Sequence, residues 1–296
     1  QRQTDASLIR IYFRYICVQN RSMYTEYQPS HLLVPYIDSY WEFKGNPDYG
    51  MRIHILPDGC TDFIFTLGEV ANAVEEGSLI MQPYRSYFVG PMTKYSELVT
   101  YTESIHMFGV RFLPCGLSCF TNLPLHEFVN SRVSTNEMKA VFDDTFIEKL
   151  GEQKHVTDRI RVVEEYLLAY LARHYQPADS HVAMAVNMIN HSKGKRSVRS
   201  LMDDVCLCQR HFERKFKHYT GFTPKEYSRI VKFKNAVELL RTTTSANLLT
   251  TAVDAGYYDL AHFSKEIKSM SGNTPASFLS LTVPEETTLT YIEPQR

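Results

Sequence analysis

A group of polar side chains lies beside a pair of phenylalanines in the last third of the chain. Phe212 and Phe216 are spaced i, i+4, so they share one face of a helix. The opposite face carries Arg210, Glu213 and Arg214. A guanidinium can donate two hydrogen bonds to guanine, and a carboxylate can accept one from cytosine N4. The residue types on this face are therefore suited to recognising the edges of nucleobases.

This pattern occurs twice, at a separation of 51 residues. The first copy reads Phe212-x-x-x-Phe216-Lys217-x-x-x-Gly221-x-x-Pro224-x-x-Tyr227. The second reads Phe263-x-x-x-Ile267-Lys268-x-x-x-Gly272-x-x-Pro275-x-x-Phe278. An internal repeat at fixed spacing indicates one structural unit built twice. Each copy has a basic amphipathic helix ahead of a turn, so the pair is suited to two stretches of duplex DNA.

The candidate contacts divide into two chemical classes. Those to bases are Arg210, Glu213 and Arg214 in the first unit and Leu260, Ala261, His262, Ser264 and Lys265 in the second. Those to phosphates, which add affinity without sequence information, are Lys193, Lys195, Arg196, Lys217, Lys225 and Lys268, with Lys232 and Lys234 beside them. A basic helix face is more often simply solvated, and a lone His such as His262 more often packs or caps. The repeat favours the DNA interpretation.

The charge distribution supports the same interpretation. The net charge of the chain is -1, but residues 181–283 hold 15 Lys and Arg against 8 Asp and Glu. A basic C-terminal domain joined to an acidic remainder is typical of a domain that meets polyanions beside one that does not.

The elements that position these side chains can be predicted in outline. We expect helices to about 190, over 197–205, 209–219, 224–241, 248–255 and 260–270, with a short helix from 275. Thr223-Pro224-Lys225-Glu226 has the form of a capping box with Pro at the first helical position. Asp179 or Ser180, and Ser197, are further expected caps. The predicted C-terminal domain is all-α, with two helix-turn-helix units joined by a long helix.

The region from about 35 to 112 has mostly a period of two, with short runs separated by Gly and Pro turns. This favours an antiparallel sandwich or β-barrel, followed by helices, and hence a two-domain α+β chain. A barrel interior can bind a small effector. Candidate effector-binding residues are Trp41, Arg52, His54, Tyr84, Tyr87 and His106. Core or surface roles are the alternative for each.

A helical segment after the barrel has apolar residues in a and d positions over two heptads, namely Ile160, Val163, Leu167, Tyr170 and His174. One interpretation is a homodimer helix, and the other is a helix packed on its own barrel. Two heptads are too short to separate them.

The expected domain boundaries are a possible extension (1–22), an N-terminal sensor or dimerisation domain (23–175), a linker (176–180), a DNA-binding domain (181–283) and a tail (284–296). The six cysteines show no disulfide framework and no zinc spacing, so we expect free thiols in a reducing cytoplasm, with no metal and no cofactor. No apolar run reaches the roughly 18 residues of a membrane span.

Residues 197–281 resemble the C-terminal domain of the AraC/XylS transcription regulators. The resemblance is carried by Arg210-His211-Phe212-x-Arg214-x-Phe216-Lys217, Gly221-Phe222-Thr223-Pro224, Ala255-Gly256-Tyr257, His262-Phe263-Ser264-Lys265 and Gly272-Asn273-Thr274-Pro275. It implies a sequence-specific regulator of transcription that reads two adjacent major-groove segments, more often an activator than a repressor, with RNA polymerase as a partner. It also assigns the base-reading positions to the residues named above.

The N-terminal part is similar, more faintly, to a sensor domain found on some members of this family. Val34-Pro35-Tyr36-Ile37, Leu56-Pro57-Asp58-Gly59 and Gly109-Val110-Arg111-Phe112-x-Pro114 carry that similarity. It implies effector binding or dimerisation without naming an effector.

Two other functions are alternatives to regulation. A cupin-like metalloenzyme needs a His-x-His motif, and the barrel region offers only isolated His54, His106 and Glu103. A sequence-tolerant architectural protein would bind unrelated DNA with a steep salt dependence. Glu213 beside Arg210 and Arg214 argues against that alternative, because a carboxylate facing phosphates is unfavourable.

Overall fold

The computed structural model describes residues 23–75, 77–138, 141–142, 144–174, 176–205, 207–242, 247–279 and 290–292. The predicted extension over residues 1–22 lies outside this part of the chain, as does most of the predicted tail over 284–296. Within the described residues, no helix has both the length and the hydropathy needed to cross a membrane.

The N-terminal domain is built on two antiparallel sheets. The larger sheet contains β1 (Tyr24–Tyr27), β2 (Ile37–Gly45), β8 (Ile105–Phe112), β4 (Thr61–Thr66), β6 (Ser86–Val89) and β9 (Arg132–Ser134), in that spatial order. The smaller sheet has the order β10 (Thr290–Ile292), β3 (Met51–Ile55), β7 (Ser96–Thr100) and β5 (Asn72–Ala73). Strand β10 comes from the predicted tail, which therefore contributes an edge strand rather than lying outside the fold.

Of the two arrangements expected for this region, an antiparallel sandwich or a β-barrel, the described residues form two packed sheets and no closed barrel. Each sheet of the described chain ends in edge strands, β1 and β9 in one and β10 and β5 in the other, so neither hydrogen-bonded ladder closes on itself. The sheets instead pack face to face, and Trp41, Phe43 and Met107 of the larger sheet share a core with Ile53 and Leu98 of the smaller. The sequence pattern fits both arrangements.

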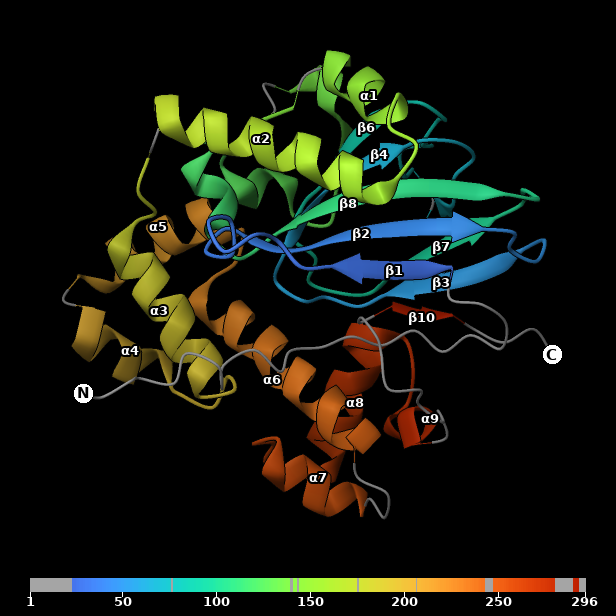
Figure 1. Cartoon of the computed structure of the whole chain (residues 1–296). Helices are drawn as coiled ribbons and strands as arrows, with labels where there is room; N and C mark the ends of the chain where they lie inside the picture. The colour runs from blue at the N-terminus through green and yellow to red at the C-terminus, as the bar shows by residue number, and fades with distance from the viewer. Residues whose placement is uncertain are drawn as a thin grey trace, which may run out of the picture.

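A helical layer covers the other face of the larger sheet (Figure 1). It contains α1 (Asp144–Gly151) and α2 (Val156–His174), and 3-10 helices η2 (Gly116–Cys119), η3 (Leu125–Phe128) and η4 (Thr135–Glu137) lie in the connecting segments. Strand β4 is therefore buried on both faces: Phe63 and Phe65 pack with Phe142 and Phe146, whereas Ile64 faces the smaller sheet.

Helix α2 packs on its own domain. Val163 and Leu167 are fully buried in the core beneath the helix, and Ile160 and Tyr170 pack against the same core. Of the two interpretations of this spacing, the structure favours a helix packed on its own domain, because four of the five side chains pack in this core and only His174 is exposed. The apolar spacing is the same for intramolecular packing and for a coiled coil, so the sequence could not separate them.

The C-terminal domain is all-α, as predicted. Its helices are α3 (Ser180–His191), α4 (Val198–Val205), α5 (Gln209–Thr220), α6 (Pro224–Thr242), α7 (Leu248–Asp254), α8 (Leu260–Ser271) and α9 (Pro275–Leu279). Asp179 caps α3 by accepting hydrogen bonds from two backbone N–H groups. The predicted capping box is present, with Thr223 Oγ1 accepting from Glu226 N at 3.2 Å and Glu226 Oε2 accepting from Thr223 N at 2.7 Å. These caps fix where α3 and α6 begin.

The two domains share a continuous apolar contact. Leu56 and Cys115 of the N-terminal domain belong to the same buried cluster as Phe216 and Tyr227 of the C-terminal domain. Gly59, with φ of 88°, lies under the Tyr227 ring, and a Cβ there would come within 2.7 Å of it. The N-terminal domain therefore packs against the long helix α6.

Candidate nucleic-acid interface

The sequence repeat is a repeat of hydrogen-bonded geometry. Helices α5 and α8 end at Gly221 and Gly272 in the left-handed conformation, with φ of 83° and 76°. The N–H of each glycine donates to the carbonyl of the lysine four residues earlier, at 2.9 Å in both units. A C′ glycine adopts this conformation without the steric cost that a side chain would add.

A buried side-chain hydroxyl supports each turn. The two residues that supply it, Thr220 and Ser271, are equivalent in the repeat but are not part of the sequence motif given above. Thr220 Oγ1 donates to Phe216 O and Ser271 Oγ donates to Ile267 O, both at 2.7 Å. Each hydroxyl also accepts from the backbone N–H two residues on, at 3.2 and 3.1 Å. Thr220 and Ser271 are 51 residues apart, so treating threonine and serine as one residue class would have added this position to the repeat.

Helix α5 presents the first candidate reading face. Phe212 and Phe216 are fully buried, whereas Arg210 and Arg214 are exposed with the whole chain present. Glu213 is half-buried and accepts a hydrogen bond from Gln209 Nε2 at 2.9 Å. The N-terminal domain therefore leaves both arginines accessible.

Helix α8 presents the second face. Leu260, Ala261, His262 and Lys265 are exposed and Ser264 is half-buried, whereas Phe263 and Ile267 are fully buried. Asp259 caps the helix through a 2.7 Å hydrogen bond from the backbone N–H of His262, and the His262 ring lies edge-on to Tyr257 at 5.4 Å. The imidazole is thus both packed on one side and accessible.

The predicted phosphate-contacting residues separate into accessible and engaged groups. Those exposed to solvent are Lys193, Lys195, Lys217, Lys225 and Lys268. Arg196 forms an ion pair with Asp204, Lys232 Nζ donates to the Gly256 carbonyl at 3.3 Å, and Lys234 Nζ donates to the Asp58 carbonyl at 3.1 Å. Lys234 therefore contributes to the contact between the domains.

A bidentate ion pair fixes the second unit to the long helix. Arg229 Nε and Nη2 on α6 donate to the two carboxylate oxygens of Glu266 on α8, at 2.7 and 3.0 Å. Fork-to-fork pairing of this kind adds geometric specificity to electrostatic attraction. The sequence gives no signal for this pair, because the two residues are 37 positions apart and lie on different helices.

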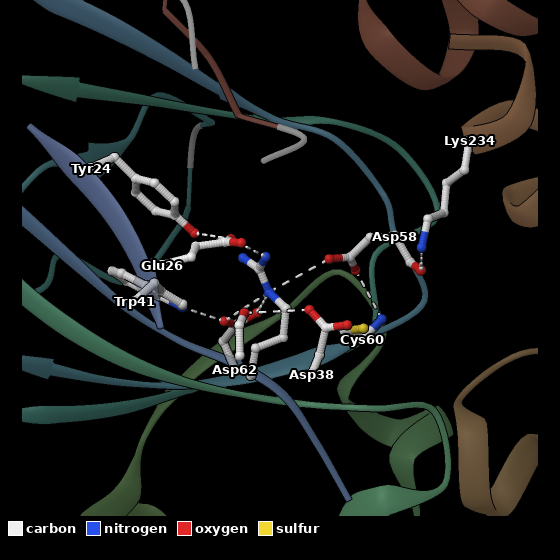
Figure 2. Close-up of polar contacts among 10 residues, drawn as sticks. Tyr24, Glu26, Asp38, Trp41, Asp58, Cys60, Asp62 and Lys234 are labelled. Atoms are coloured by element: carbon white, nitrogen blue, oxygen red, sulfur yellow. Dashed lines mark hydrogen bonds and ion pairs between the residues drawn. The ribbon is translucent and has the colours of Figure 1, made fainter. Parts of the chain in front are cut away.

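The N-terminal domain contains a cluster of buried charged side chains around Arg111. Three carboxylates, labelled in Figure 2, form ion pairs with the guanidinium of Arg111: Glu26 at 3.3 Å, Asp58 at 3.6 Å and Asp62 at 3.3 Å. Burial alone would lower the pKa of Arg111, but Asp62 and the neighbouring acidic groups raise it well above its usual range. Burial also raises the pKa of Asp62 despite the attraction of Arg111. The cluster keeps its cation charged inside the domain.

The candidate effector-binding residues do not converge on one site. Trp41 is buried and its indole N–H donates to Asp62 Oδ1 at 2.7 Å (Figure 2). Arg52 pairs with Glu97, His54 stacks on Tyr95, and His106 pairs with Glu42 at 2.9 Å. Tyr84 is exposed, and the Tyr87 hydroxyl accepts from Gln82 N at 2.7 Å. Of the six, Trp41 alone borders the hollow between the sheets.

The cysteines in the described part of the chain are free thiols, as expected: Cys60, Cys115, Cys119 and Cys208. Burial raises the pKa of Cys60 and Cys115, which opposes formation of a thiolate ligand. Across the residues that the structure describes, no group of three or more His, Cys, Asp or Glu side chains is arranged to hold a metal ion.

Residues 201–280 match a helix-turn-helix domain family, and residues 25–134 match a domain of unknown function (DUF6597). No curated protein matches the chain. Among solved structures the chain is similar to ToxT from Vibrio cholerae, with 9% identity over 82% of this chain and 99% of that one and a TM-score of 0.49. It is also similar to the xylose-binding transcription activator XylR, at 22% identity over 38% of this chain and 30% of that one, with a TM-score of 0.33.

A third similar structure is the C-terminal domain of AraT, a response regulator from Geobacillus stearothermophilus, with 20% identity over 37% of this chain and 92% of that one and a TM-score of 0.33. The helix-turn-helix match spans both repeated units, α4 with α5 and α7 with α8. The exposed polar residues described above lie on α5 and α8, within this match. The chain therefore carries a helix-turn-helix DNA-binding domain of the AraC type and is a transcription regulator, and its residues 25–134 match a domain of unknown function.

Proposed function

We propose that this regulator reads one asymmetric DNA site through two neighbouring major grooves. Helix α5 inserts Arg210, Glu213 and Arg214 into the first groove. Helix α8 lies in the second, where its base contacts come from Leu260, Ala261, His262, Ser264 and Lys265. Because leucine and alanine are poor hydrogen-bonding partners, the second helix reads thymine methyl groups and groove shape as well as base edges.

The observation that carries this proposal is the matched pair of units on either side of α6. Both recognition helices end in the same hydrogen-bonded glycine turn, and both keep their polar faces exposed. Helix α6 has 19 residues and so is about 28 Å long, close to the roughly 34 Å of one helical turn of DNA. This length supports simultaneous reading of two adjacent grooves on one side of the duplex.

Phosphate contacts from the exposed lysines Lys193, Lys195, Lys217, Lys225 and Lys268 orient the domain on the duplex without specifying sequence. Arg196 joins this set when DNA competes with its Asp204 partner. We further propose that the regulator acts in the cytoplasm, that it activates transcription through contact with RNA polymerase, and that a small effector bound by the N-terminal domain controls it.

The proposal is tested by selecting bound duplexes from a pool of genomic fragments with the full chain. We expect an enriched motif of two blocks whose centres are about one helical turn apart. Equal retention of unrelated fragments, with affinity governed by salt alone, would instead identify a sequence-tolerant architectural protein.

A further inference from the structure

One loop of the N-terminal domain contacts both units of the repeat. We name residues 90–96, between β6 and β7, the strap. A Cβ placed on Gly221 would lie 2.5 Å from the Cγ of Pro91, and a Cβ placed on Gly272 would lie 2.7 Å from the Cζ of Tyr95. Pro91 is buried, and Tyr95 packs against the apolar core of the C-terminal domain. The strap therefore touches the turn that ends each recognition helix.

The two glycines are equivalent positions of the repeat, 51 residues apart, whereas the strap residues that touch them are only four apart. Four residues of chain span at most about 14 Å. Each glycine N–H holds the last turn of its helix by donating to a lysine carbonyl at 2.9 Å. A single short segment thus relates one point on α5 to the matching point on α8.

The strap is itself fastened to the N-terminal domain. It begins where β6 ends, and it runs into β7. Asn130 holds its middle, because the Asn130 N–H donates to Pro91 O and the Asn130 Oδ1 accepts from Thr93 N, both at 2.8 Å. The Tyr95 ring stacks on His54 of β3, with 5.5 Å between the ring centroids and 7° between the ring planes. Both contact points are therefore fixed relative to the sheets.

The helix between the two units is held by the same domain. Lys234 on α6 donates to the Asp58 carbonyl at 3.1 Å, and the Tyr227 ring of α6 covers Gly59. The N-terminal domain therefore contacts α5, α6 and α8 at once. A movement of either unit about α6 would have to break a contact with the strap.

Small movements of this kind matter for DNA recognition. Adding one base pair between two sites on a duplex separates them by about 3.4 Å more and rotates one about the axis by about 35°. Recognition helices that pivot freely on α6 can follow such a change, at the cost of ordering them in each complex. Recognition helices that are held at fixed points bind one spacing and reject the next.

We propose that the strap is a brace that positions the two recognition helices relative to each other, with Pro91 and Tyr95 as positioning residues that determine which spacing of the two DNA blocks the chain accepts. The brace stops each unit from pivoting at its glycine turn, so the units are ordered before DNA binds. The effect on DNA spacing rests on the proposed function, whereas the restraint of the turns does not.

The restraint is measured without DNA, by following hydrogen–deuterium exchange of the full chain in fragments that contain Gly221 or Gly272. Exchange of these amides requires local opening of the helix ends, so its rate reports whether the strap holds the turns. Tyr95→Ala should accelerate exchange at least threefold in the Gly272 fragment alone, and Pro91→Ala in the Gly221 fragment alone. Asn130→Gly, which releases the middle of the strap and suits the φ of 57° at that position, should accelerate both.

Tyr101→Ala is the matched control, because Tyr101 is exposed and lies beyond the opposite end of β7 from Tyr95, and it should leave both fragments unchanged. Thermal melts monitored by circular dichroism establish that each variant is folded. Unchanged exchange at the contacted turn in folded Tyr95→Ala or Pro91→Ala would overturn the brace. Equal acceleration at both turns in every variant would also overturn it, because that result indicates general loosening of the fold.

The effect on recognition is measured as the affinity of the full chain for the selected DNA site and for versions with one base pair inserted or removed between the blocks. Wild type should bind the altered spacings at least tenfold more weakly, and this ratio should fall at least threefold in Tyr95→Ala and in Asn130→Gly. An unchanged ratio in both folded variants would overturn the role in spacing. A chain that selects no DNA sequence fails the proposed function instead, and the exchange measurements still decide whether the strap restrains the turns.

Discussion

At the scale of single residues, the two units place different chemistry on the same scaffold. Arg214 and Lys265 hold equivalent positions in the repeat, and both are exposed. A planar guanidinium can make a bidentate contact with guanine, whereas an ammonium acts as a point charge. The first unit is therefore the better candidate for strict base recognition, and the second for looser discrimination.

Arg214→Ala should weaken binding to the selected DNA site by about 1–3 kcal/mol and relax specificity at one base pair of the first block, because a bidentate base contact is lost. Fluorescence anisotropy with the full chain, using each single-base variant of the site, measures both effects. Arg161→Ala, on the N-terminal domain, is the matched control. Unchanged affinity together with unchanged base preference would remove Arg214 from the reading face.

A histidine at the domain contact gives a pH dependence of defined sign. The His218 ring lies 6.4 Å from His126. Burial and the neighbouring His126 lower the pKa of His218, against a smaller opposing effect of Glu127. Because the unfolded chain then binds this proton more readily than the folded chain, this contribution to stability is present above about pH 6.5 and is lost as the pH falls toward the depressed pKa.

We therefore expect His218→Gln to reduce the loss of unfolding free energy between pH 8 and pH 5.5. Urea denaturation at the two pH values gives the quantity, and His191→Gln on the exposed end of α3 serves as the control. An equal loss in wild type and His218→Gln would show that protonation of His218 does not disturb the domain contact.

At the scale of elements, the repeat reveals one helix that begins without a side-chain cap. Asp259 caps α8 with a hydrogen bond to His262 N, but Cys208, at the equivalent position 51 residues earlier, makes no such bond at the start of α5. A thiol is a weak acceptor, so the first backbone N–H groups of α5 lack the partner that the carboxylate gives α8.

Cys208→Ser should stabilise the chain by about 0.5–1 kcal/mol, because a serine hydroxyl accepts from the exposed N–H groups in the first turn. The free energy of unfolding in urea measures the gain, and Cys208→Ala should produce no comparable gain. A serine variant no more stable than the alanine variant would mean that water already satisfies these groups equally well.

The same elements show how far the sequence determines the fold. The helices of the C-terminal domain begin and end within about one residue of their predicted bounds, because caps, glycine turns and apolar spacing are local signals. The sheets were less predictable. Strand β4 is buried on both faces and β10 comes from near the C-terminus, and neither pairing has a local signature.

The candidate site likewise has parts with a local sequence signal and parts without one. The candidate reading faces were apparent because Phe212 and Phe263 mark the buried sides of their helices. Arg229 and Glu266 carried no signal, because their ion pair joins α6 to α8, two helices whose contact sequence spacing does not reveal. The contact of Tyr95 with Gly272 likewise joins segments from different domains, which spacing alone does not relate.

At the scale of the whole molecule, the N-terminal domain packs on the DNA-binding units without covering their polar faces. It contacts α6 through Gly59 and Lys234, and the two glycine turns through Pro91 and Tyr95. In Figure 1, α6 runs between the two units. The spacing of the recognition helices is thus set by one long helix and supported from behind by a second domain.

This arrangement makes the spacing of the two DNA blocks the most direct test of the account. The affinity of the full chain is measured for the selected site and for versions with 5 or 10 base pairs inserted between the blocks. Because α6 holds the recognition helices at one separation, both insertions should weaken binding to about the level of a site with a single block. Full affinity after either insertion would contradict simultaneous reading by α5 and α8.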